Sequence, residues 1–141
     1  MNPEPELAQG FRTGLARSIL GEIAEHLMVL ADTGQTAAID LRSLPMTAAD
    51  RAELEEVLGH GEVEVALDVA GTSEAWETSY AGVWWVRHYG DGERIASERI
   101  EIAPLPEILA AHHADIVAAA SRLRGDLTKM APAGEELVHV Q

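Results

Sequence analysis

The residues whose types could bind a metal form one small cluster, His112, His113 and Asp115. A chelating pair on a helix needs a spacing of about four residues, because adjacent side chains point roughly 100° apart. Neither the adjacent histidines nor the His113–Asp115 pair has that spacing. The other histidines are scattered over different predicted elements. We therefore predict no metal site, with these side chains solvated or capping a helix.

Motifs for nucleophilic catalysis and phosphate binding are absent from the sequence. No serine lies in a GxSxG motif, and there is no phosphate-binding loop or GxGxxG fingerprint. The chain contains no cysteine, which excludes disulfides, thiolate nucleophiles and cysteine-ligated zinc or iron–sulfur centres built by this chain alone. Paired glutamates could perform acid–base chemistry, but on helix fronts and outward strand faces they are more often a solvated surface. We predict that the protein is not an enzyme and holds no cofactor.

The charge balance limits the classes of partner. The chain has 10 Lys and Arg against 24 Asp and Glu, a formal net charge of −14. Such a charge repels nucleic-acid phosphates and anionic membranes, and it favours a basic partner. No apolar run approaches the ~20 residues of a membrane span, and no signal-peptide pattern stands at the start. The sequence predicts a cytoplasmic protein that binds neither nucleic acid nor membranes.

The elements that must position these residues begin with two helices and a strand. Apolar residues that recur every three or four positions predict a helix from Leu15 to Leu30, which Gly34 would end. "TAAIDL" then reads as a short strand. The second helix has a clear start signal, because Thr47 and Asp50 form a capping-box pair.

Four neighbouring strands and a last helix follow. The strands are expected at "EVEVALDV", "AWETSY", "AGVWWVRHY" and "ERIASERIEI". The last helix is expected over "EILAAHHADIVAAASRL" and should end at Gly125. Neighbouring strands flanked by helices indicate an α+β fold, here an antiparallel meander of about four to five strands with three helices. We predict one domain over residues 15–125, a flexible N-terminus over 1–14 and a C-terminal tail over 126–141.

Two of the tryptophans are adjacent, so Trp84 and Trp85 must point to opposite faces of the sheet. The register of the following hairpin decides which one lies in the core. A two-residue turn at Asp91–Gly92 would pair Trp85 with Glu98 and make Trp85 the core residue. A three-residue loop would pair Trp84 with Glu98 instead. We favour the second register because it separates apolar from polar residues better.

The favoured register predicts a binding surface. It places Trp85 on the outer face between Arg87 and Arg99, and tryptophan and arginine are enriched at binding hot spots. This patch would contact a partner or a second copy of the chain, and exposed glutamates would add attraction to a basic segment. The predicted partner-binding residues are Trp85, Arg87, Arg99, Glu53, Glu56, Glu62 and Glu64.

Four segments, in order within residues 35–125, resemble a known family. They are "DLRSLP", "LGHGEVEV", "ETSYAGVWWV" and "IEIAPLPEIL". Together they resemble the C-terminal conserved domain of the HupH family, accessory proteins of nickel–iron hydrogenase maturation. The resemblance implies a chaperone-like role toward the precursor of the hydrogenase small subunit, which carries iron–sulfur clusters and an arginine-bearing export signal, or toward other maturation proteins. It implies no catalytic residue, and the absence of cysteine leaves a binding role rather than a cluster-carrier role.

Two functions of other classes stay open at this point. One is a generic acidic interaction module unrelated to hydrogenases. The other is a small hydrolase or isomerase with an unrecognised carboxylate site. A deep pocket that holds a perturbed Glu or Asp would favour the enzyme, whereas an apolar patch on a sheet or groove would favour a binding protein.

Overall fold

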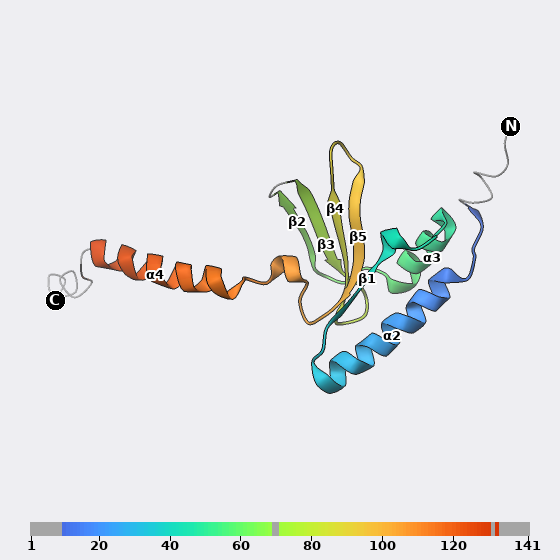
Figure 1. Ribbon diagram of the computed structural model, residues 1–141, viewed down its shortest axis with the longest axis horizontal. Coiled ribbons are helices and arrows are strands. Elements are labelled where there is room, and N and C mark those ends of the chain that lie inside the picture. Colours follow the sequence, from blue (N-terminus) through green and yellow to red (C-terminus); the bar gives the residue numbers. More distant parts are fainter. Residues whose placement is uncertain (1–9, 69–70, 131, 133–141) are drawn as a thin grey trace. The chain divides into compact units, whose positions relative to one another are not determined.

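The computed structural model describes residues 10–68, 71–130 and 132. The chain divides into two compact units, residues 1–106 and 107–141. The first unit contains a sheet and two helices, and the second contains the last helix (Figure 1). The strands are β1 (Ala37–Asp40), β2 (Glu64–Asp68), β3 (Thr72–Glu77), β4 (Val83–Tyr89) and β5 (Ile95–Ile102). The helices are α2 (Leu15–Thr33), α3 (Ala48–Leu58) and α4 (His113–Lys129), with 3-10 turns η1 (Leu41–Ser43) and η2 (Glu107–Leu109).

The five strands form an open antiparallel sheet in the order β1-β5-β4-β3-β2. β2 to β5 are the predicted meander, and β1 pairs with β5 at the far edge. α2 and α3 lie along one side of this sheet (Figure 1). The predicted α+β class and the order helix, strand, helix, meander, helix are confirmed.

The two predicted helix boundaries are confirmed by their local hydrogen bonds. Gly34 ends α2 in the left-handed region (φ 79°), where its N–H donates to the Leu30 carbonyl at 2.8 Å. α3 begins with a complete capping box: the Asp50 N–H donates to the Thr47 hydroxyl at 3.0 Å, and the Thr47 N–H donates to the Asp50 carboxylate at 3.2 Å. Two donors that the first turn would leave unsatisfied are therefore paired.

The hydrophobic core lies between this helix pair and one face of the sheet. Each helix presents a stripe at helical spacing, and β4 and β5 present alternate residues. The buried side chains include Ile19, Ile23, Leu54, Leu58, Val83, Trp85, Ile100 and Ile102.

The favoured hairpin register is wrong. β4 pairs with β5 so that Trp85 faces Ile100 and Trp84 faces Glu101, whereas both sequence-based registers paired a tryptophan with Glu98. The connection is longer than "GDG" suggested, because the Gly90 N–H closes it onto the Arg94 carbonyl at 2.8 Å. The pairing also shifts between His88 and Tyr89, where an irregularity adds a residue to the ladder.

The new register reverses the expected exposure of Trp85. Trp85 shares a face with Val83, Ile100 and Ile102 and is fully buried in the core beneath the helices. Trp84 is also buried, at 4% exposure, but on the opposite face. Both faces of this strand are therefore covered where the two tryptophans lie.

The last helix begins later and ends later than predicted. Residues Glu107–Leu109 form the turn η2, and α4 starts after His112, whose extended backbone occupies the N-cap position. Asp115 lies in the first turn, where its negative charge interacts favourably with the positive end of the helix dipole. Gly125 does not end the helix. Residues 126–129, predicted as tail, belong to α4, and residues 1–9 and 133–141 lie outside the described part of the chain.

Candidate functional site

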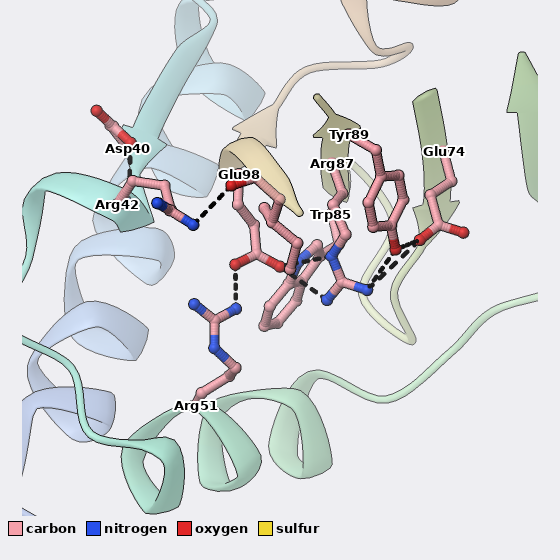
Figure 2. A network of polar contacts seen from close by, with 9 residues as sticks. Asp40, Arg42, Arg51, Glu74, Trp85, Arg87, Tyr89 and Glu98 are labelled. Carbon is pink, nitrogen blue, oxygen red and sulfur yellow. Dashed lines mark hydrogen bonds and ion pairs between the residues drawn. The ribbon is translucent and has the colours of Figure 1, made fainter. Parts of the chain in front are cut away.

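A buried carboxylate, Glu98 of β5, is the centre of a polar network on the helix-covered face of the sheet (Figure 2). It accepts a hydrogen bond from the Trp85 indole N–H at 2.8 Å. The Arg87 guanidinium reaches it from Nε at 2.8 Å and from Nη2 at 2.7 Å, and Arg51 of α3 donates to its other oxygen. Burial raises the pKa of Glu98, but the bonds from Trp85, Arg51 and Arg87 outweigh it and hold the pKa below its usual value.

The network continues from Arg87 toward β3. Nη1 of Arg87 lies 3.4 Å from both a Glu74 carboxylate oxygen and the Tyr89 hydroxyl, and Tyr89 donates to Glu74 (Figure 2). Burial lowers the pKa of Arg87, but its bonds to Tyr89 and Glu98 raise it overall. The guanidinium also lies over the ring of Trp76, 5.0 Å from the ring centroid.

An aromatic stack borders the same network. Trp76 lies between His60 and Trp85, with ring centroids 5.2 Å and 5.5 Å away and interplanar angles of 8° and 10°. The stack therefore connects His60, just after the end of α3, to Trp85 on β4 in the middle of the sheet.

This geometry is suited to holding structure rather than to proton transfer. A general base at neutral pH needs an available lone pair and a pKa near 7. Glu98 is instead an ionised group whose two oxygens are engaged by Trp85, Arg87 and Arg51. Because Arg51 belongs to α3, the network fixes that helix on the sheet.

The predicted tryptophan–arginine patch is not formed. Arg87 lies on the helix-covered face, directly opposite Glu98, whereas Arg99 faces Val86 on the other side of the sheet. Arg99 is ion-paired there with Glu101 at 2.8 Å. Trp85 is fully buried on the helix-covered face, so it offers no contact surface.

The four predicted glutamates lie on two different elements. Glu53 and Glu56 are on α3, where Glu53 faces Arg12 at 3.8 Å. Glu64 is exposed at the start of β2, the edge strand of the sheet, and Glu62 is exposed two residues before it. Their role in partner binding stays a prediction.

An apolar groove between α2 and α3 is a feature that the sequence reasoning missed. Its volume is about 220 Å³, and the β3–β4 turn closes one side. The turn is anchored by two bonds: the Ser79 N–H donates to the Leu58 carbonyl at 2.8 Å, and the Thr78 hydroxyl donates to the Val83 carbonyl at 2.9 Å. The lining residues are Leu20, Ile23, Ala24, Leu27, Val57, Leu58 and Tyr80.

The described part of the chain has neither a metal-binding cluster nor a membrane-spanning helix. Within residues 10–68, 71–130 and 132, no group of three His, Asp or Glu side chains could hold a metal ion. The helices described there include none that is both long and apolar enough to cross a membrane.

Known proteins similar to this chain share its sequence pattern and its fold. The family described as "HupH hydrogenase expression protein, C-terminal conserved region" matches residues 15–130. The chain belongs to the HupH family. A solved structure, the hydrogenase expression protein HupH from Thiobacillus denitrificans, is 39% identical with a TM-score of 0.76 over 84% of this chain and 99% of that one.

Curated relatives carry similar names. The hydrogenase-1 operon protein HyaF of Escherichia coli is 33% identical over 84% of this chain and 40% of its own length. The hydrogenase expression/formation protein HoxQ of Azotobacter vinelandii is 31% identical over 62% of this chain and 31% of its own length. The chain therefore matches about a third of the length of these HupH-family relatives.

Proposed function

We propose that this chain is a non-catalytic accessory protein of hydrogenase maturation, which binds a hydrogenase subunit precursor or another maturation protein in the cytoplasm. The observation that carries the proposal is the family match over residues 15–130. The relatives named above are hydrogenase expression, formation or operon proteins, so the same process is the simplest role for this chain. This argues against a generic interaction module.

The geometry of the site favours binding over catalysis. The carboxylates with shifted pKa values, Glu98 and Asp50, are both shifted downward and are held by hydrogen bonds within the fold. The groove that opens between α2 and α3 is lined by apolar side chains and the ring of Tyr80. A hydrolase or isomerase would need a pocket with a perturbed acid in it. An apolar groove is instead typical of a protein that holds a partner segment.

The charge of the chain favours one partner over others. A net charge of −14 accelerates association with a basic segment, and salt slows that association. The precursor of the small subunit, with its arginine-bearing export signal, is therefore the partner that we favour.

Deletion and co-purification test this proposal. Loss of the gene should abolish or strongly reduce mature hydrogenase activity in the organism that encodes it, with the small-subunit precursor accumulating. The affinity-tagged chain should co-purify with that precursor at low salt and less at physiological salt. Normal hydrogenase maturation in the deletion strain would refute the role, and co-purification with the large subunit alone would refute the choice of partner.

A further inference from the structure

We infer that the groove between α2 and α3 is the docking site for an apolar partner segment that carries basic residues. The inference rests on the proposed function and names the surface that would perform it. Three features of the first unit support it: exposed apolar side chains at the rim, a rigid wall and an acidic flank.

The rim of the groove carries apolar side chains that are exposed or only partly buried. Val57 of α3 is 46% exposed and Tyr80 is 49% exposed, and both line the groove. Leu20, Ala24 and Leu27 follow one flank of α2 at helical spacing. Met28, one turn after Ala24, extends this flank and is 67% exposed. Exposed apolar side chains grouped around a groove are typical of an interaction site.

The wall of the groove is already in place before a partner arrives. Tyr80 stands in the β3–β4 turn, where its own N–H donates to the Thr78 hydroxyl at 3.2 Å. Gly82 (φ 89°) lets the chain pass close to α2, because a Cβ there would lie 3.4 Å from Leu27. Docking onto a preorganised wall costs little ordering free energy.

The charges around the groove select a basic segment. Glu53 lies one turn before Val57 on α3, and Glu56 is its neighbour. On α2, Arg17 lies one turn before Leu20. The basic residues of the segment should therefore lie over α3, away from Arg17.

The arginines of this unit leave most of its negative charge unbalanced. Arg51, Arg87 and Arg99 pair with glutamates of the sheet and do not neutralise the α3 flank, whereas Arg12 pairs with Glu53 of that flank at 3.8 Å.

Two synthetic peptides test the charge and the apolar requirement together. One carries a run of leucine and alanine with two arginines at one end, and the other carries two glutamates in the same positions. Fluorescence anisotropy of the labelled peptides on the full chain should show at least tenfold tighter binding of the arginine peptide. Equal affinities, or no binding of either peptide at millimolar concentration, would overturn the inference.

A pair of matched variants locates the site. Val57→Asp places a charge in the groove rim, whereas Val29→Asp places one on the far flank of α2, where Val29 is 41% exposed. Both positions are exposed and near the C-terminal end of a helix, so the melting temperatures should change alike. Peptide affinity should fall about tenfold or more in Val57→Asp, since a charge resists burial against apolar groups, and change less than about twofold in Val29→Asp. Equal losses in the two variants would contradict the location.

Charge reversal and sedimentation complete the test. Glu56→Lys should weaken the arginine peptide, whereas Glu25→Lys on the opposite side of α2 should not. Sedimentation velocity should show the same mass for the parent and for Val57→Asp. If the parent is a dimer and Val57→Asp is a monomer, the groove binds a second copy of the chain, and the inference is overturned. If Val57→Asp still co-purifies with the hydrogenase precursor, the docking site is wrong while the proposed function stands.

Discussion

Replacement of Glu98 by Gln should destabilise the domain more than any charge-removing change on its surface. Glu98 is fully buried and is the shared acceptor for Trp85, Arg87 and Arg51 (Figure 2). A glutamine keeps the size of the side chain and one acceptor oxygen, but it removes the charge that balances two guanidinium groups. The two arginines are then left facing a neutral amide.

The magnitude follows from how far each arginine can return to water. Breaking a buried ion pair by removal of one partner costs about 3–5 kcal/mol. The side chains of Arg51 and Arg87 keep 31% and 17% of their exposure, so partial resolvation reduces the loss. We expect a decrease of about 2–4 kcal/mol in the free energy of unfolding, which corresponds to roughly 10–25 °C in melting temperature for a domain of this size.

Urea unfolding followed by tryptophan fluorescence measures this loss directly, because Trp85 donates to Glu98 and reports on the same site. Glu62→Gln, on the exposed approach to β2, is the control and should change stability by less than about 0.5 kcal/mol.

The pH dependence gives a second measurement. The folded pKa of Glu98 is depressed, so its contribution is present above the unfolded pKa and is lost as pH falls through the folded pKa.

The parent domain should therefore lose stability on acidification more steeply than Glu98→Gln. Indistinguishable acid profiles for the two proteins, or a loss below about 1 kcal/mol at neutral pH, would show that the buried ion pairs are not what holds α3 on the sheet.

Two further predictions concern other parts of the fold. Asp50→Ala removes the capping box of α3 and the bonds from the Thr13 N–H at 2.8 Å and the Thr13 hydroxyl at 2.6 Å, so urea unfolding should show a loss of about 2–3 kcal/mol at neutral pH. Burial raises the pKa of Asp50, but bonds from Thr13 and Thr47 lower it overall, so this loss should shrink as pH falls through the folded pKa; a constant difference would contradict the assignment. Trp85→Ala should cost about 3–5 kcal/mol in the same assay, because it leaves a core cavity and removes a donor to Glu98; a near-neutral result would restore the outer-face placement.

Local signals in the sequence were sufficient for the order of elements. The capping pair Thr47 and Asp50 and the terminal Gly34 each act within a few residues, and the fold preserves them. The end of the last helix was missed because a glycine is only a weak breaker: Gly125 costs about 1 kcal/mol relative to alanine, and α4 continues through it.

The hairpin register failed for a reason that lies outside the hairpin. Separation of polar from apolar residues was the criterion, and it placed Arg87 on the outer face, whereas Arg87 lies on the core face and pairs with the buried Glu98. Glu98 is buried because Arg51, 47 residues earlier in the chain, comes from α3 to neutralise it. The run "VWWV" carried the better signal, since uninterrupted apolar residues are typical of a strand that is covered on both faces. Both Trp84 and Trp85 are indeed buried.

The groove could not be predicted from the sequence of any one segment, because its lining residues come from α2, α3 and the β3–β4 turn. Its shape depends on where α3 lies. Arg51 ties this helix to Glu98 on the sheet, and Asp50 ties its first turn to Thr13. Val57, on the same helix, forms the groove rim. A change at Glu98 would therefore weaken docking only by displacing α3, in contrast to a change at Val57, which removes the contact itself and leaves the buried network intact.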